Sequence, residues 1–371
     1  MKTEVTVLYE PYSHSGYAEL LVQNGVVESL PTRRYRAPGV RVRVLSDGTW
    51  GPHSEVPKSS TGWPADVEPL RSGDLDDPAW GRYPRPPGNV ARSLALRSRA
   101  DFCIPAFGPW PDNLYHWTLE ILPRVFFALQ AVPKEASVEI VIPLVATKDA
   151  SFREMLDAVV DRPVKIRPTR RRVRFRSAVV ADTVVSSEPV ESPNGIRATR
   201  DTAIHPLAFL EFAIALREGL RRRVSQAPNL PNLPAQIKGM VFLDRGPAAR
   251  RPYNRNEVLT LVAALGAEIV RPHELSRAEL QGRLSQAQVV VAPHGAGITN
   301  VVLCENLSRL IVLTPETHVK QRALWTNIAG PQGATAVFVA GSSPDGYSDS
   351  DRRPHTFRMT DISAAFRHEI A

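Results

Sequence analysis

The chain has 371 residues, and its 46 lysines and arginines exceed its 38 aspartates and glutamates, which gives a net charge of +8. This length exceeds what one hydrophobic core normally serves, so two domains are expected, and the positive charge favours anionic partners such as nucleotide sugars, phosphorylated lipids, polyanionic glycans or nucleic acid. The two distant cysteines argue against a disulfide framework, and no window reaches the roughly 18 apolar residues of a membrane span. We therefore expect a soluble, cytoplasmic protein, at most peripheral to the inner face of a membrane.

The first half of the chain contains short strand patterns followed by helical ones. A Pro/Gly-rich tract over residues 51–88 is expected to be a loop or lid. Arg172, Arg174 and Arg176 alternate with smaller or apolar residues, which predicts a strand with one basic face. The expected strands lie at residues 5–9, 18–22, 40–45 and 138–143, and the expected helices at 117–129, 151–160 and 206–224.

Strands and helices alternate in the second half, beyond a proline-spaced linker over residues 227–235. This alternation predicts a doubly wound parallel sheet, and such sheets bind ligands at the carboxyl ends of their strands. We expect an N-terminal α/β domain over 1–226, a second α/β domain over 236–345 and a tail over 346–371. The expected strands lie at residues 239–244, 267–271, 287–292 and 310–313, and the expected helices at 256–265, 276–287 and 361–369.

Polar and aromatic side chains gather between residues 113 and 124. His116 and Glu120 are four residues apart and would share one face of a helix. A carboxylate orients an imidazole and stabilises its charged form, so the pair could serve as a general base. The alternative is a partly exposed His-Glu pair on a helix that has no functional role. If only the spacing of the two residues is considered, this alternative is favoured. Residues that could contact an acceptor or a sugar ring are Asn113, Tyr115, Trp117 and Arg124. A core position is an equal alternative for Tyr115 and for Trp117.

Arginines cluster after the strand that is expected to end near residue 244, where Arg245 and Arg251 precede Asn256 and Glu257 at the start of a helix. Guanidinium groups bind phosphate oxygens bidentately, so this loop could hold an anion. An arginine-rich loop that is merely exposed to solvent is about as frequent as one that binds an anion.

A second loop with anion-binding character follows the apolar strand at 287–292. Its glycines, Gly295 and Gly297 on either side of Ala296, allow close backbone approach to a ligand. The next segment would offer free peptide N-H groups, among them those of Thr299 and Asn300. His294 and Arg245 each lie just past the carboxyl end of a predicted strand, so both are expected to line one crevice. An isolated His-Gly-Ala-Gly sequence is as often a plain turn.

Together these three motifs resemble glycosyltransferase family 61, whose members include xylosyltransferases, O-linked N-acetylglucosaminyltransferases and bacterial capsule-synthesis proteins. The matching residues are Asn113 to Arg124, Arg245 with Arg251 and the Asn256-Glu257 pair, and Pro293 to Asn300. The resemblance implies a GT-B-like fold of two facing Rossmann-like domains with a cleft between them. It also implies a nucleotide-sugar donor bound mainly by the second domain, and inversion without a bound metal. The chain lacks an acidic residue in the strand at 310–313, so Glu316 could supply a ribose contact instead.

The predicted function is transfer of a sugar from a nucleotide-diphosphate donor to a hydroxyl of a glycan or other acceptor, in bacterial surface polysaccharide synthesis. His116 would take the hydroxyl proton, and Arg245, Arg251 and the loop N-H groups would stabilise the departing diphosphate. No cofactor or metal is expected, because Asp74-Leu-Asp76 and Asp349-Ser-Asp351 lie in turn-rich stretches. One alternative is a non-catalytic glycan- or polyanion-binding relative. The other is a nucleic-acid-binding protein that uses the arginine clusters at residues 170–176 and 221–223. A nicotinamide oxidoreductase is disfavoured, because its glycine fingerprint is absent.

Overall fold

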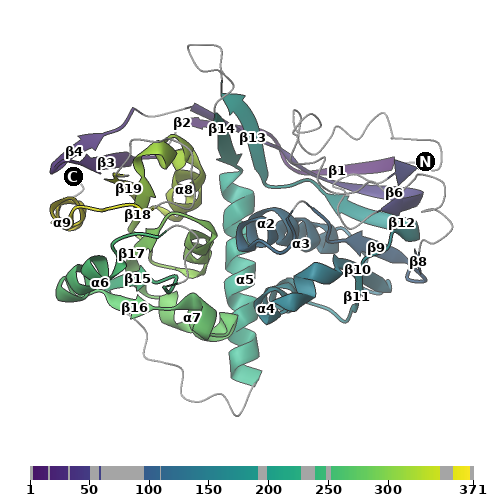
Figure 1. Ribbon diagram of the computed structural model, residues 1–371. Coiled ribbons are helices and arrows are strands. Elements are labelled where there is room, and N and C mark those ends of the chain that lie inside the picture. Colours follow the sequence, from purple (N-terminus) through teal and green to yellow (C-terminus); the bar gives the residue numbers. More distant parts are fainter. Residues whose placement is uncertain are drawn as a thin grey trace. The chain divides into compact units, whose positions relative to one another are not determined.

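A computed structural model describes residues 3–15, 17–31, 34–50, 58–59, 96–108, 110–190, 199–226, 239–247, 252–342 and 354–367 (Figure 1). Two compact units make up the chain. Unit 1 comprises Met1–Tyr12, Arg36–Pro189 and Ala203–Gly219, and unit 2 comprises Ser13–Tyr35, Val190–Thr202 and Leu220–Ala371. Each unit is an α/β assembly around one large sheet with several parallel strands.

The sheet of unit 1 has the strand order β1-β6-β12-β9-β10-β11, with β7 beside β6 and β8 beside β12. Parallel pairing joins β12, β9, β10 and β11, whereas β1, β6 and β12 pair in antiparallel fashion. The strand bounds are β1 (Thr3–Tyr9), β6 (Val40–Trp50), β7 (Lys58–Ser59), β8 (Leu96–Arg97), β9 (Phe102–Pro105), β10 (Val138–Pro143), β11 (Lys165–Thr169) and β12 (Val173–Ala181).

The basic face predicted for the strand around residue 174 is confirmed. Along β12, Arg174 and Arg176 are exposed while Val173 and Phe175 are buried, because successive side chains of a strand point to opposite faces. Every residue of the apolar β10 is buried, as expected for a parallel strand inside a sheet.

Helical segments connect the strands of unit 1, and α3 packs against β12 and β9. The predicted helix at 117–129 is three consecutive segments, which include one π-helical turn. The bounds are α2 (Leu114–His116), the π-helical η2 (Trp117–Ile121), α3 (Leu122–Gln130), the 3-10 helix η3 (Leu144–Lys148), α4 (Ala150–Val159) and α5 (Pro206–Gln226), of which residues 206–219 belong to unit 1.

A glycine permits the close approach of α4 and α5 in unit 1. A Cβ atom added at Gly219 would lie 1.8 Å from the backbone oxygen of Ala158, and no side-chain rotation can relieve such a clash. We expect Gly219→Ala to lower the free energy of unfolding by about 2 kcal/mol or more, because overpacking outweighs the gain of about 1 kcal/mol in helix propensity. Urea denaturation measures the loss. The exposed neighbour Glu218 provides the control, since Glu218→Ala should leave stability nearly unchanged, and a Gly219→Ala protein as stable as wild type would contradict the packing.

Unit 2 contains a seven-stranded sheet in the order β16-β15-β17-β18-β19-β3-β4. All of its neighbours pair in parallel except the terminal hairpin of β3 and β4. This confirms the predicted parallel sheet. The bounds are β3 (Glu19–Gln23), β4 (Val26–Ser29), β15 (Gly239–Leu243), β16 (Glu268–Val270), β17 (Ala287–Pro293), β18 (Arg309–Pro315) and β19 (Thr335–Gly341).

Helices cover both faces of this sheet, with α6 and α9 on one side and α7, η5 and α8 on the other (Figure 1). The α7 helix begins with a capping box, in which Ser276 and Glu279 bind each other's backbone N-H groups. The bounds are α6 (Arg255–Ala264), α7 (Arg277–Leu284), α8 (Arg322–Ala329), α9 (Met359–Arg367) and the 3-10 segments η4 (Pro272–Glu274), η5 (Ala296–Leu303), η6 (Glu316–Gln321) and η7 (Gly330–Gln332).

The core of unit 2 lies between the sheet and the α6 and α9 layer. Phe242, Val291, Ile311 and Val339 come from four adjacent strands and are fully or almost fully buried. Apart from the two large sheets, β2 (Tyr12–Ser15) pairs with β5 (Arg34–Ala37), and β13 (Val185–Val190) pairs with β14 (Thr199–Ile204).

The boundaries of the units differ from the expected division at residue 226. Residues 13–35 belong to unit 2, because β3 extends its sheet beside β19. A short strand pattern does not indicate which sheet the strand will join. Within the expected lid at 51–88, the described residues are Lys58–Ser59, which form β7 and pair with β6. The rest of that tract, the linker at 227–235 and most of the polar stretch before α9 lie outside the described residues. Among the described residues, no helix is long and apolar enough to cross a membrane.

Candidate functional site

The first candidate site lies where the strand order of unit 2 reverses. From β15, the chain moves outward to β16 on one side and then to β17, β18 and β19 on the other. In such doubly wound sheets, ligands bind outside the carboxyl ends of the two strands at this switch point. The residues that follow these strands are Asp244 and Arg245 after β15, and His294 and Gly295 after β17.

Arg245 and the His294 loop are in direct contact. The Arg245 Nη1 donates a hydrogen bond of 2.8 Å to the backbone oxygen of His294. Gly295 has φ 142° and ψ −179°, a conformation that essentially only glycine adopts. A Cβ at Gly295 would also lie 2.5 Å from Arg245 Nη1. The structure therefore brings Arg245 and His294 together, whereas the crevice that they are predicted to line stays a prediction.

The segment after Gly295 is a 3-10 helix, η5, rather than an α-helix. Its first backbone bond joins the Ile298 N-H to the Gly295 oxygen at 3.0 Å. The N-H groups that precede this bond, those of Ala296 and Gly297, are the ones a helix start leaves for a ligand. The free N-H groups predicted from the sequence include those of Thr299 and Asn300, which lie further along the helix.

Asn300 stabilises the loop from within. Its Nδ2 donates to the Gly297 oxygen at 2.8 Å, and its Oδ1 accepts a bond of 2.6 Å from the buried Arg277. The Thr299 hydroxyl is buried and has no hydrogen-bond partner within the described part of the chain. Asn300, itself held by Arg277 of the neighbouring α7, therefore fixes the shape of the loop before a ligand binds.

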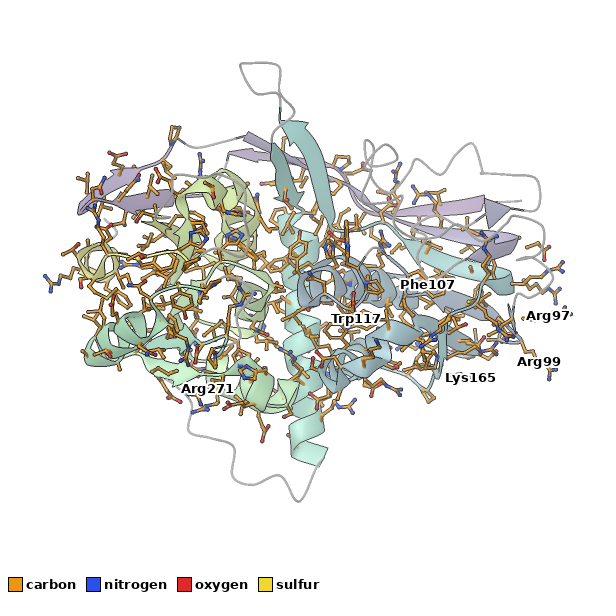
Figure 2. The ribbon with its side chains drawn as sticks, viewed as in Figure 1. Arg97, Arg99, Phe107, Trp117, Lys165 and Arg271 are labelled. Carbon is orange, nitrogen blue, oxygen red and sulfur yellow. The ribbon has the colours of Figure 1, made fainter. Side chains whose placement is uncertain are left out.

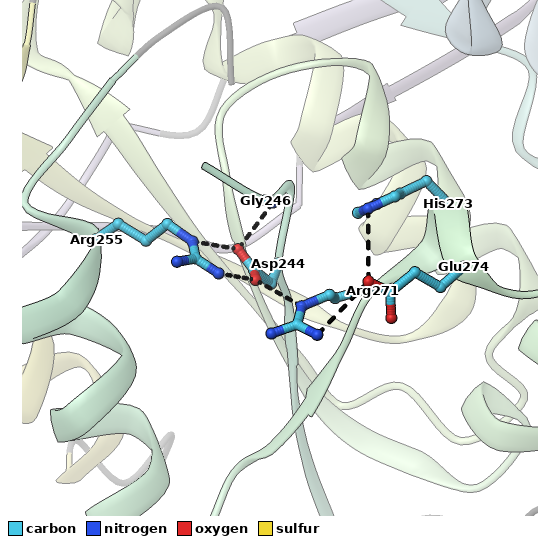
Figure 3. Close-up of polar contacts among 6 residues, drawn as sticks. All are labelled: Asp244, Gly246, Arg255, Arg271, His273 and Glu274. Atoms are coloured by element: carbon cyan, nitrogen blue, oxygen red, sulfur yellow. Dashed lines mark hydrogen bonds and ion pairs between the residues drawn. The ribbon is translucent and has the colours of Figure 1, made fainter. Parts of the chain in front are cut away.

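Asp244 anchors the arginines on the β15 side of the switch point (Figure 3). Its Oδ1 accepts from Arg255 Nε at 2.9 Å and from the Gly246 N-H at 3.0 Å, and its Oδ2 accepts from the Arg255 Nη2 and from Arg271 Nε at 3.3 Å. Burial raises the pKa of this carboxyl, but the hydrogen bonds from Arg255 and Gly246 outweigh it, so the pKa lies below its usual value. Asp244 is an ionised, fully buried carboxylate.

Asn256 and Glu257 lie at the exposed start of α6. Glu257 accepts a hydrogen bond of 2.7 Å from Asn254, whose side chain also binds the backbone N-H and oxygen of Phe357. The structure therefore places Glu257 in a contact that ties α6 to the segment before α9. Arg251 lies outside the described residues.

His294 is almost completely buried and lies among polar and aromatic side chains of β18, η6 and α8. Its Nδ1 is 3.3 Å from the Thr314 hydroxyl and 3.3 Å from Trp325 Nε1. The His318 ring lies 5.2 Å from the His294 ring between centroids. Glu316, one of the predicted nucleotide contacts, is exposed and accepts a hydrogen bond of 3.0 Å from Gln23.

The second candidate site is in unit 1, where His116 and Glu120 form the predicted pair. His116 Nδ1 lies 2.8 Å from Glu120 Oε2, and the carboxylate is buried whereas the imidazole side chain is 16% exposed. The Trp110 and Tyr115 rings lie 5.0 and 5.1 Å from the imidazole between centroids. A buried carboxylate at Nδ1 fixes the ring and directs Nε2 away from the carboxylate.

Three other residues of this motif have structural contacts in unit 1. Trp117, labelled in Figure 2, is fully buried. It stacks on Phe152 and donates from its indole to the Phe152 oxygen at 3.1 Å, so it occupies a core position and not a sugar-contact position. The buried Arg124 donates to the Phe107 oxygen at 2.9 Å. Asn113 caps α2 by accepting the Tyr115 N-H. Tyr115 is half-buried.

No group of three or more histidine, cysteine, aspartate or glutamate side chains that could bind a metal ion occurs in the part of the chain that the structure describes. The Asp74-Leu-Asp76 and Asp349-Ser-Asp351 sequences lie outside it.

A doubly wound unit with an arginine and a glycine loop at its switch point, in one chain with a second α/β unit that carries a His-Glu pair, is consistent with a glycosyltransferase fold. The family model Glycosyltransferase 61 matches residues 114–311, more than half of the chain. The chain therefore belongs to glycosyltransferase family 61 and is a glycosyltransferase. No curated protein matches it in sequence. The matched range includes the His116-Glu120 pair, Arg245 and the His294 loop.

Several site residues were not predicted from the sequence. Asp244 could have been identified, since it is the first polar residue after an apolar strand. Arg255 precedes the predicted Asn256 by one position, and only the helix orientation shows that Arg255 is the residue that faces Asp244. Thr314 and Trp325 carry no local signal, because their contacts with His294 depend on the order of the strands.

Proposed function

We propose that this glycosyltransferase moves a sugar from a nucleoside-diphosphate donor to an acceptor hydroxyl with inversion at the anomeric carbon. The observation that carries the proposal is the contact of Arg245 with the His294-Gly295 backbone at the switch point of unit 2. A guanidinium beside a glycine loop and a helix start supplies converging N-H donors for a diphosphate.

In this proposal, unit 2 binds the donor and His116 of unit 1 accepts the proton. The acceptor oxygen forms a bond to the anomeric carbon as the bond from that carbon to the diphosphate oxygen breaks. The hydroxyl proton moves to His116 Nε2, and Glu120 stabilises the imidazolium. Arg245 and the N-H groups of Ala296 and Gly297 stabilise the charge on the leaving diphosphate. Such a division of roles corresponds to a GT-B-like enzyme.

The proposed acceptor is a glycan hydroxyl, as in the synthesis of a bacterial surface polysaccharide in the cytoplasm or at the inner face of the membrane. The exposed Arg174 and Arg176 form a positively charged face on β12, and such a face attracts polyanions. This face supports binding to an acidic acceptor or to an anionic membrane surface.

Replacing Arg245 tests the donor site. We expect Arg245→Ala to weaken the binding of uridine diphosphate or a related nucleotide by about 1 to 3 kcal/mol, the usual scale for hydrogen bonds to a charged group. Isothermal titration calorimetry measures the affinity. Arg153→Ala, which removes an exposed arginine of α4 in unit 1, is the matched control. Equal affinity in Arg245→Ala and wild type would reject this assignment.

A second variant, Gly295→Ala, changes the same site through the backbone loop. Gly295→Ala forces a side chain into the position of the Arg245 guanidinium, so it should weaken nucleotide binding as well. Gly266 also has a positive φ, of 86°, but an added Cβ there meets nothing within 4 Å. Gly266→Ala therefore places a side chain at a positive φ without a clash and should leave nucleotide affinity unchanged.

Transfer in this proposal needs no divalent cation, because Arg245 and the loop supply the positive charge that a cation would provide. Activity should persist within about twofold in excess EDTA. Initial rates with and without the chelator measure this. A strict requirement for manganese or magnesium, restored when the ion is added back, would contradict the proposed charge stabilisation.

A further inference from the structure

The neighbours of His294 determine which of its ring nitrogens carries the proton. The Trp325 Nε1 lies 3.3 Å from His294 Nδ1, and the two rings meet edge to face with an angle of 86°. The Thr314 hydroxyl lies 3.3 Å from the same nitrogen. Water has little or no access to these atoms, since His294, Thr314 and Trp325 are each at most 5% exposed.

An indole N-H can only donate a hydrogen bond. His294 Nδ1 must therefore accept, because a proton on Nδ1 would face the indole proton and deprive the buried Trp325 N-H of this acceptor, which costs about 1–3 kcal/mol. The Thr314 hydroxyl fits either tautomer, because it can donate to the Pro315 oxygen at 3.4 Å, and the assignment therefore rests on the indole. A neutral His294 then carries its proton on Nε2.

Two other groups near His294, Arg245 and His318, act in the same direction. Arg245 binds the His294 backbone oxygen, and the His318 ring of η6 lies 5.2 Å away between centroids. Arg245 is a cation and His318 can become one, so both disfavour the positive charge that a doubly protonated His294 ring would carry. The neutral ring is the form that fits this environment.

His116 has the opposite arrangement. Its Nδ1 faces the carboxylate of Glu120 at 2.8 Å, and a carboxylate accepts hydrogen bonds. His116 Nδ1 therefore carries the proton and Nε2 has the lone pair, as a base requires. His294 offers an N-H where His116 offers a lone pair.

We propose that Trp325 is a positioning residue that holds His294 as a neutral imidazole protonated on Nε2, so that His294 donates a hydrogen bond to a diphosphate oxygen and does not act as a base. The identity of the ligand rests on the function proposed above, whereas the protonation of His294 follows from the contacts alone. Through Trp325, the site gains a neutral hydrogen-bond donor, the His294 Nε2-H, beside the positively charged Arg245.

Nitrogen-15 NMR of histidine-labelled protein tests the proton position directly, since protonated and unprotonated ring nitrogens differ strongly in chemical shift. His294→Gln assigns the signal. We expect the neutral His294 of wild type to show a protonated Nε2 and an unprotonated Nδ1. Trp325→Phe keeps an aromatic ring but removes the N-H, so His294 should become a mixture of both tautomers. Trp117→Phe, which removes a buried indole N-H in unit 1, should leave the His294 signal unchanged.

Affinity for uridine diphosphate provides the functional measurement. Trp325→Phe should weaken binding by roughly twofold to tenfold, because part of the His294 population no longer offers a proton on Nε2. A protonated Nδ1 in wild type, or an unchanged tautomer in Trp325→Phe, would overturn the inference even if nucleotide binds. A wild type with the expected tautomer that binds no nucleoside diphosphate would overturn the proposed function and leave the proton assignment intact.

Discussion

Replacement of His116 should reduce turnover by about 10² to 10⁴, the range that a general base contributes. His116→Ala removes the proton acceptor from unit 1, whereas Arg245 and the His294 loop of unit 2 are unchanged. Donor affinity should therefore remain close to that of wild type. Steady-state kinetics combined with direct nucleotide titration separate the two quantities.

Variants of two carboxylates provide the controls. Glu120→Gln should reduce turnover less than His116→Ala, because the imidazole remains but loses the carboxylate that orients it. Asp157→Asn removes the carboxylate of another ion pair with the same spacing, on the surface of α4, and should leave turnover unchanged. Near-normal turnover in His116→Ala would remove the base assignment. Simultaneous loss of donor binding would give His116 a different role.

The buried Asp244 should make stability depend on pH on the acidic side. We expect Asp244→Asn to lower the free energy of unfolding at pH 7 by about 1–3 kcal/mol, because Arg255 loses its ionised partner. The wild-type carboxyl has a lowered pKa in the folded state, so its contribution is complete above the unfolded value of about 3.9. The contribution is lost as the pH falls through the folded value.

Urea denaturation at several pH values measures this effect. The difference between wild type and Asp244→Asn should be constant from pH 8 to about 5 and shrink below about pH 4. The exposed pair of α4 again gives a control, because Asp157→Asn should change stability little at any pH. A difference between wild type and Asp244→Asn that does not vary with pH would show that the Asp244 carboxylate has no lowered pKa.

Hydrophobic periodicity predicted most of the regular structure that surrounds the sites. The buried strands β10, β17 and β18 and the helices α4, α5 and α6 follow the expected ranges closely. The helices are long enough to show their period, and the strands are continuous apolar runs bounded by polar or turn residues. The strand β19 and the helix α8 were not predicted, although the apolar run at 335–340 is typical of a buried strand. The π-helical turn at Trp117–Ile121 has no simple sequence signal.

The site residues were predictable where a motif fixed its own geometry. His116 and Glu120 pair because a helix brings residues four apart together, and Arg245 meets the His294 loop because parallel strands end at one edge. Side-chain direction was less predictable. Trp117 faces the core, and Asn300 bonds its own loop, because packing decides which face of a helix is buried.

The position of β3 has a consequence for biosynthesis. Leu20 and Leu21 pair with Val337 and Phe338 of β19, so one of the first strands to be translated finds its partner only when nearly the whole chain has been made. Until then the β3-β4 hairpin has an unpaired edge, which is prone to pairing with other chains. Contacts between such distant residues also slow folding. A fragment that starts after residue 238 would expose the edge of β19, so fusions or truncations meant to isolate unit 2 need to supply residues 17–31.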